Sequence, residues 1–355
     1  FFKQKTAYEI SLGLVGSEMC IRDSTGGAPS ADIDEIKFNA PKSYESQNRC
    51  VTIFDYVTTI KSDYTGADAV VAWGGEDADP PVYGKVYVAI KPTSGAVLTE
   101  SAKTLVKDTI LKQRNIVGIS PEIVDPDYMY LKVNSTVKYD SGRTTNSASV
   151  LKSTVSTAVT DFGETNLKSF DKSFRYSKLV QSIDEAEVSI KSNQTSVTIK
   201  RLLYPALGSS AAYTLPFSNQ IYHPANNFWG AVTSAEFSYN DSVNTLWTGC
   251  RLQDDDGVLQ VYRSSGEERI LVDNNVGTIT YLSGKVELKS FKPIAIGSET
   301  TGNTTPLEVT VTPASADILP LREQIILIES GDVNITMLDD AGTVSYTHLT
   351  LPTKA

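Results

Sequence analysis

The 355-residue chain is poor in the side chains that carry most enzymatic chemistry, since it has only two histidines and three cysteines. Three cysteines in a chain of this length do not make a disulfide framework, and no CxxC pair is present to hold zinc. No apolar run reaches about 18 residues, so we expect no membrane-spanning helix. Asp and Glu outnumber Lys and Arg by 42 to 32, which leaves no basic footprint for nucleic acid.

The common motifs for phosphate binding and hydrolysis are also missing, namely GxGxxG, GxxxxGK[ST] and GxSxG. His223 stands between Tyr222 and Pro224 without a second His or Cys nearby. A general base needs an orienting partner, so we interpret His223 as structural or exposed. The acidic clusters at 76–79 and 254–256 lack the ligand register of a calcium loop and read as solvated turns. The sequence therefore predicts no catalytic residue, no metal and no cofactor.

The two ends of the chain differ in character from the rest. Residues 1–24 and 344–355 look like translated sequencing-adapter read-through, and neither has the plan of a signal peptide. We therefore treat both segments as non-native and leave them out of the fold prediction. Residues 25–83 are expected to be a linker followed by a short helix and strand of a truncated upstream domain.

Local signals for a helix and two strands are clear in the first third of the chain. Thr52 with Asp55 three residues later forms a near capping box, which predicts a helix over 52–63. The apolar run 69–73 ends at a Gly-Gly pair and predicts a buried strand. Alternating apolar residues predict another strand over 84–92.

Residues 84–203 are predicted to form an α+β domain. Apolar residues at helical spacing predict helices over 98–116, 147–162 and 172–187, and Gly163 is expected to end the second of these. Alternation predicts strands over 129–139 and, with a polar interruption, over 188–203. The resulting β-α-β-α-β order predicts a two-layer α/β sandwich, because each helix needs a sheet on which to bury its apolar stripe.

Residues 204–343 are predicted to be a mostly β C-terminal domain. Helical patterning nearly vanishes there, and short alternating runs are separated by explicit turns such as Asp-Asp-Gly at 255–257 and Ser-Gly at 283–284. The predicted strands lie at 236–239, 250–253, 258–262, 269–272, 278–282, 285–288, 306–312 and 324–329.

Large aromatic residues in irregular sequence are the candidates for an interface. They are Trp73, Phe228, Trp229 and Trp247. Such side chains are enriched among the anchors of protein–protein contacts. The alternative is that they fill the core, and the sequence does not decide between the two.

Several separated motifs together carry a resemblance over roughly 36–341. They are Asn48-Arg49, Val51-Thr52 and Asp55-Tyr56, then the acidic glycine loop with Pro80-Pro81, Tyr83 and Gly84, then the segments 175–187 and 313–332. In this order they resemble the baseplate wedge proteins of T-even-type contractile-tailed bacteriophages, within the wider baseplate J-like family. The chain departs from that pattern at Cys50, where a small residue is more usual, and lacks the family's N-terminal part.

The resemblance implies a structural protein and not an enzyme. It would join wedge subunits into a ring around the tail hub, as a homodimer that also contacts other wedge proteins. It would be assembled in the host cytoplasm, would reside in the virion tail baseplate, and would bind neither nucleic acid nor membrane. A β-rich receptor- or carbohydrate-binding tail module is the alternative, suggested by residues 204–343 and their tryptophans.

Overall fold

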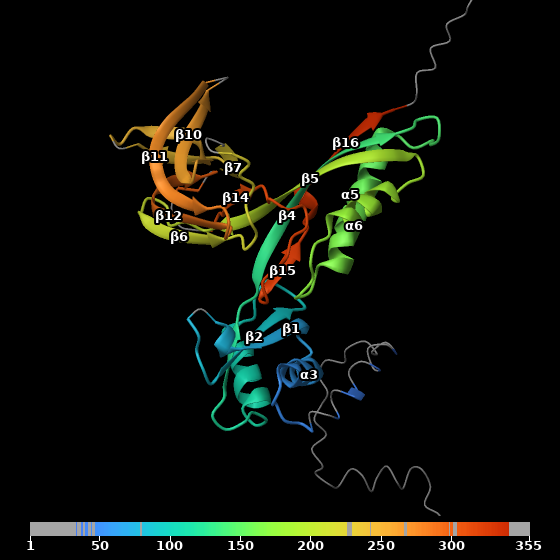
Figure 1. Cartoon of the computed structure of the whole chain (residues 1–355), viewed down its shortest axis with the longest axis vertical. Coiled ribbons are helices and arrows are strands. Elements are labelled where there is room, and N and C mark those ends of the chain that lie inside the picture. The colour runs from blue at the N-terminus through green and yellow to red at the C-terminus, as the bar shows by residue number, and fades with distance from the viewer. Residues whose placement is uncertain are drawn as a thin grey trace, which may run out of the picture. The chain divides into compact units, whose positions relative to one another are not determined.

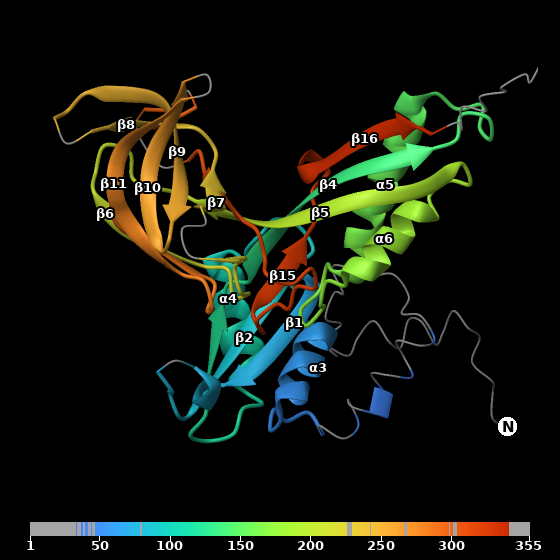
Figure 2. The same ribbon diagram turned by 45° about the horizontal axis from the view of Figure 1, so that its top comes forward.

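The computed structural model describes residues 47–340, apart from 79, 226–228, 242, 266–267, 298 and 301–303, together with a few isolated positions between 33 and 44. The two terminal segments that resemble adapter sequence lie outside this part. The chain divides into two compact units, Phe1–Val124 and Asp125–Ala355. Each is described below by itself (Figures 1 and 2).

The first unit is a three-stranded sheet with helices packed on it. Its strands are β1 (Ala67–Gly74), β2 (Lys85–Pro92) and β3 (Ser120–Val124), in the order β1-β2-β3. β1 and β2 are antiparallel, whereas β2 and β3 are parallel. A parallel pair needs a crossover, and α4 (Glu100–Leu105) with η2 (Val106–Leu111) supplies it. A single 3-10 turn, η1 (Gly75–Asp77), follows β1.

Helix α3 (Ile53–Asp63) begins where the sequence predicts. The Thr52 hydroxyl accepts from the Asp55 N–H, and the Asp55 carboxylate accepts from the Thr52 N–H at 2.8 Å, which completes the capping box. Tyr56 and Ile60 point into a core shared with Val88, Ile90 and other buried apolar residues of the sheet and of η2. Local capping and a buried stripe therefore fix this helix together.

The predicted helix 98–116 is shorter than expected and changes type. Thr99 caps it as predicted, accepting from the Ala102 N–H at 3.3 Å. After Leu105 the helix continues as a π-helix over Val106–Leu111. This wider helix is rare in proteins overall, and where it occurs it is often at a functional site. Residues 112–116 are not helical.

The second unit begins with two long strands and the two helices between them. They are β4 (Asp127–Tyr139), α5 (Ala148–Asn166), α6 (Tyr176–Asp184) and β5 (Ile190–Leu203). β4 and β5 are antiparallel neighbours, and their register runs from the pair Tyr130 and Lys200 to the pair Tyr139 and Ile190. Alternate β4 residues such as Met129 and Leu131 are fully buried in one core with side chains of both helices. The alternation predicted for 129–139 is confirmed.

Beyond β5 the chain forms a series of strands, here called the β-rich excursion, before its last strands return to pair with β5 and β4. The excursion contains β6 (Ala211–Pro216), β7 (Trp229–Ser234), β8 (Phe237–Asn240), β9 (Leu246–Asp255), β10 (Val258–Ser265), β11 (Glu268–Thr280), β12 (Lys285–Phe291) and β13 (Pro293–Ile296). β14 (Leu307–Val311) then pairs with β5, and β15 (Gln324–Leu327) and β16 (Val333–Asp339) pair in parallel with β4; η3 (Ser330–Asp332) joins the last two. One sheet of order β15-β4-β5-β14-β7-β9-β10-β11-β12-β6 results.

This topology confirms a mixed α and β fold and corrects its predicted arrangement. The expected 84–203 sandwich does not form a unit, because its first strand pairs with β1 and β3 while 127–139 lies in the other sheet. The described helix and strand of the predicted 25–83 segment do not belong to an upstream domain either, since α3 and β1 pack with β2 and β3. Residues 204–343 are not separate, because β14, β15 and β16 return to β5 and β4. Long-range pairing, which local periodicity does not encode, decides these boundaries.

Two smaller expectations about breaks in regular structure are also wrong. Gly163 does not end its helix, which continues to Asn166. A Cβ at this glycine would lie 3.1 Å from the Ile328 Cβ, so the glycine serves close packing of α5 on the segment after β15. The polar interruption at 191–195 does not break β5, because its exposed residues simply face solvent within one continuous strand.

A buried ammonium group gathers three carboxylates from two segments of the second unit, β14 and the turn around η3. The Lys200 side chain is 5% exposed, and its Nζ lies 2.5 Å from Asp332 Oδ2, 3.6 Å from Glu308 Oε1 and 3.9 Å from Glu329 Oε2. The same Nζ lies 5.1 Å from the centroid of the Tyr130 ring. Its neighbour Arg201, also buried, pairs with Asp127 and donates to the Pro216 carbonyl at 2.7 Å. These two residues tie β5 to β4, β14, η3 and the end of β6.

Replacing Lys200 with Met is expected to destabilise the second unit by about 3–5 kcal/mol, because Asp332 would remain buried without a counterion. Thermal and urea denaturation of the Lys200→Met variant and of the unaltered chain would measure this loss of stability. The control is Lys152→Met on the exposed face of α5, which we expect to change stability by less than about 0.5 kcal/mol. Equal denaturation midpoints for the two variants would contradict a stabilising role for the buried pair.

Candidate functional site

Trp73, the first of the predicted interface aromatics, lies near the end of β1. It faces Tyr87 of β2 as its cross-strand partner, and their rings stack with centroids 5.9 Å apart and planes 27° apart. The Trp73 side chain is half-buried. Cross-strand aromatic pairs of this kind stabilise a sheet, so a structural role accounts for the contacts of Trp73.

Trp247 lies on β9 and is likewise committed to contacts within its own unit. Its indole N–H donates to Asp241 Oδ2 at 3.1 Å, and the Arg263 guanidinium carbon lies 5.9 Å from its ring centroid. The ring also packs against the large core of the second unit. These contacts hold the indole in place and leave it half-buried.

The other two aromatic candidates fall at the margin of what the structure describes. Phe228 and the side chain of Trp229 lie outside the described residues, while the Trp229 backbone begins β7 opposite Asp255. Trp73 belongs to the first unit and the other three candidates to the second. Their role as an interface stays a prediction.

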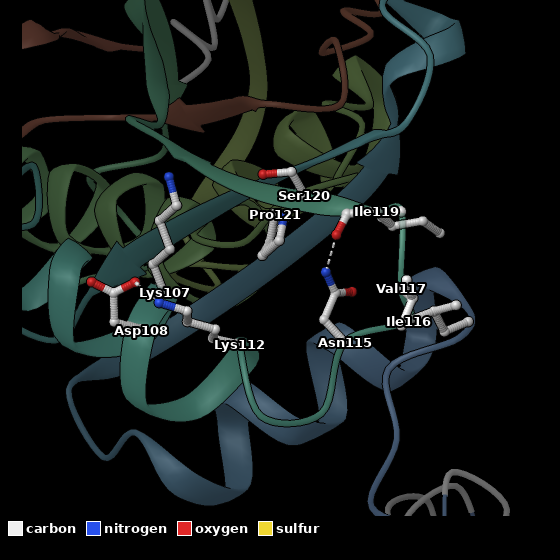
Figure 3. Close-up of a pocket in the computed structure, with 10 residues that line it drawn as sticks. Lys107, Asp108, Lys112, Asn115, Ile116, Val117, Ile119, Ser120 and Pro121 are labelled. Carbon is white, nitrogen blue, oxygen red and sulfur yellow. Dashed lines mark hydrogen bonds and ion pairs between the residues drawn. The ribbon is translucent and has the colours of Figure 1, made fainter.

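A hollow of about 440 Å³ in the first unit was not predicted from the sequence (Figure 3). It lies between η2, the loop that follows it and the start of β3. Its walls are formed by Lys107, Asp108, Lys112, Asn115, Ile116, Val117, Gly118, Ile119, Ser120 and Pro121. We call it the η2–β3 groove.

Hydrogen bonds from the core fix the loop that forms one wall of the groove. The buried Tyr56 hydroxyl donates to Asn115 Oδ1, and Asn115 Nδ2 donates to the Ile119 carbonyl (Figure 3). The Cys50 N–H donates to the Arg114 carbonyl at 2.8 Å, which sets the segment before α3 beside the loop. Burial raises the pKa of Tyr56 to about 12, so its hydroxyl keeps its proton and remains a donor.

The tip of the loop is a tight turn that presents an apolar side chain. The Ile119 N–H donates to the Ile116 carbonyl at 3.2 Å, and Gly118 has φ of +93° at the third position. A positive φ there is the signature of a type II turn and favours glycine. Val117 at its corner is 100% exposed, and its neighbour Ile116 is exposed too. An apolar edge therefore adjoins the η2–β3 groove.

The opposite wall of the η2–β3 groove is basic in a chain whose net charge is −10. Lys107 and Lys112 are both exposed, and Lys112 Nζ lies 4.0 Å from the Asp108 carboxylate, a distance typical of a weak surface pair. Figure 3 shows the two lysines at one side of the hollow and Ile116 with Val117 at the other. Such an arrangement suits a segment that carries a carboxylate beside a large apolar side chain.

The residues weighed for chemistry have structural contacts. His223 stacks on Tyr281, with ring centroids 4.1 Å apart, and its Nε2 lies 3.4 Å from Asp256 Oδ1. Asp254 is fully buried, contrary to the solvated turn predicted for 254–256, because it accepts from the Gly230 N–H at 3.0 Å, the Val232 N–H at 2.9 Å and the Tyr281 hydroxyl at 2.9 Å. This carboxylate anchors β7 to β9.

Neither a metal-binding cluster nor a transmembrane helix is found in the described part of the chain. No group of three or more His, Cys, Asp or Glu side chains is placed to hold a metal ion there. None of the described helices combines the length and the apolar character needed to span a membrane.

The two described cysteines are expected to be unreactive in the folded protein. Cys50 and Cys250 are fully buried, and burial raises the pKa of both thiols, that of Cys250 to about 11. In a Cys20→Ser background, Ellman's reagent at pH 8 should label almost no thiol until denaturant is added, and then two. Rapid labelling of either cysteine without denaturant would contradict the burial described here.

Comparison with known proteins identifies two consecutive family matches. Residues 52–124 match the family model of baseplate structural protein gp6, C-terminal domain I, and residues 127–201 match that of gp6 C-terminal domain III. The chain is 25% identical over 230 residues to baseplate wedge protein gp6 of Enterobacteria phage T4. This alignment covers 65% of the present chain and 33% of the phage T4 protein, so the chain spans about a third of that relative.

Proposed function

We propose that this chain is a structural component of a contractile phage tail baseplate wedge. It joins wedge subunits into a ring around the tail hub through protein–protein contacts and has no catalytic role. Its place is the virion tail baseplate, after assembly in the host cytoplasm. Both matching family models and the phage T4 relative are named as baseplate proteins, in keeping with this proposal.

One observation carries the proposal furthest. The two family models meet between residues 124 and 127, and the structure divides into its two compact units between Val124 and Asp125. Their agreement supports a common architecture, beyond scattered similarity in a Ser/Thr-rich chain.

The alternative function, a receptor- or carbohydrate-binding tail module, receives no support from Trp247. It was suggested by tryptophans in the β-rich region, but Trp247 is held by Asp241 and Arg263 and packs on the core. A sugar stacks on an open aromatic face, and the Trp247 ring is already in contact with its own unit. The baseplate wedge function is therefore preferred.

The η2–β3 groove is where we propose that the first unit meets another wedge protein. Its lysines and the apolar edge at Val117 would receive a partner segment with a carboxylate beside a large apolar side chain. Long-range attraction between opposite charges would orient this partner, and burial of Val117 and Ile116 would hold it.

Co-expression with the other wedge proteins of the same phage would test the function. We expect a stable complex on affinity purification, and we expect Val117→Asp to reduce its yield at least tenfold, because a charge would be buried. Val188→Asp is the matched control, since Val188 is also highly exposed but belongs to the second unit. Failure to bind any baseplate protein would overturn the function, whereas equal yields for the two variants would move the contact away from the groove.

The chain is also expected to associate with itself. Sedimentation velocity at increasing concentration should show species larger than the 38.5 kDa monomer by the high micromolar range. Monomeric behaviour throughout that range would count against a homodimer, while leaving contacts with other wedge proteins to the co-expression experiment.

A further inference from the structure

β6 forms an open margin of the large sheet. It is the last strand in the order, and among the described strands it pairs with β12 alone. It lies at the outer border of the β-rich part of the second unit (Figure 1). Ala212 and Thr214 are exposed, whereas Leu215 is buried in the core. The open side of this strand therefore offers the backbone N–H and C=O groups of Ala212 and Thr214 to a further strand, whereas the Pro216 carbonyl already accepts from Arg201.

The side chains of β6 lack the features that usually protect an edge strand. Exposed edges commonly carry a charge or an internal proline, which discourages pairing with another chain. β3 has Pro121 and Glu122, and β1 has Asp68. β6 reads AAYTLP, with no charged residue and with proline only at its last position. The irregularity in the β6–β12 ladder adds its extra residue to β12.

The surrounding sequence is also without charge. Residues 202–235 contain no Asp, Glu, Lys or Arg, although the chain-wide 21% would place about seven in a stretch of that length. It is the longest such stretch in the chain. The nearest charged groups across the ladder are Lys285 and Glu287 of β12, which form an ion pair at 2.5 Å and compensate each other. β6 is thus an uncharged border on an acidic protein.

A two-fold contact between copies needs such a border. An isologous interface places the same patch of both copies in contact, so any net charge on the patch faces an equal charge of the same sign. Two copies with a net charge of −10 repel, and this repulsion is smallest where each presents no charge. An antiparallel pair of identical edge strands has this two-fold symmetry and needs only backbone groups to form.

We propose that two copies of this chain pair through β6, antiparallel and about a two-fold axis, and so continue the sheet from one copy into the next. The proposal rests on the proposed baseplate function and names the surface for its self-association. Six residues bury less than the roughly 1,200 Å² of a standard stable interface, so the contact is weak alone. In a ring it would act together with the other contacts between subunits.

Charge variants at Thr214 would test the pairing in the full chain. Thr214 is exposed near the middle of β6, so its two copies would lie close to the axis. Its cross-strand neighbour within the monomer is Glu287, so Thr214→Lys should leave the monomer folded. We expect Thr214→Lys and Thr214→Glu each to weaken self-association at least tenfold by sedimentation, and an equimolar mixture of the two to restore it.

Matched controls separate this result from a general effect of charge. Thr214→Ser and the helix variant Thr157→Lys, on the exposed face of α5, should self-associate like the unaltered chain. Unaltered association of Thr214→Lys would overturn pairing through β6 while leaving the baseplate function intact. A chain that is always monomeric, yet binds another wedge protein in a manner that Thr214→Lys abolishes, would assign β6 to that partner and would also overturn the proposal.

Discussion

The antiparallel ladder between β4 and β5 is the interaction on which the second unit depends. β4 receives β15 and β16 on its other edge, and β5 receives β14, so strands from opposite ends of the unit meet on this pair. The helices α5 and α6 bury their apolar stripes in the same core as β4. Lys200 and Arg201 are adjacent on β5: Lys200 attracts the carboxylates of the returning segments, and Arg201 pairs with Asp127 of β4. Because a buried charge is costly unless paired, Lys200 penalises any arrangement in which the returning segments are absent.

Local structure was largely predictable because its causes are local. The Thr52–Asp55 capping box marks the start of α3, and the alternation of 129–139 marks β4. The strand β3 was missed because Pro121 lies within it, and a proline argues against a strand unless the strand is at an edge. The pairing of β16 with β4 joins residues about 200 positions apart. No periodicity in either segment encodes such a pairing, and so the domain boundaries drawn from sequence were wrong.

The candidate surfaces were less predictable than the fold. Tryptophans were chosen by residue type, but their surroundings depend on cross-strand neighbours such as Tyr87 and on partners such as Asp241. The η2–β3 groove depends on a turn whose single sequence signal is Gly118, and exposure of Val117 follows from the turn geometry. The absence of charge over 202–235 is visible in the sequence. Its meaning emerges only when β6 is found at the end of the sheet.

The continuity of β5 has a consequence for how the second unit comes apart. One unbroken strand of 14 residues belongs both to the helix-covered layer and to the β-rich excursion. Opening either region would leave half of the β5 backbone without hydrogen-bond partners. The two regions therefore share one free-energy barrier to unfolding and melt cooperatively. Amide protons in β4 and in β14 would then exchange with solvent through the same global opening, and the unit would behave as a single stiff element under load.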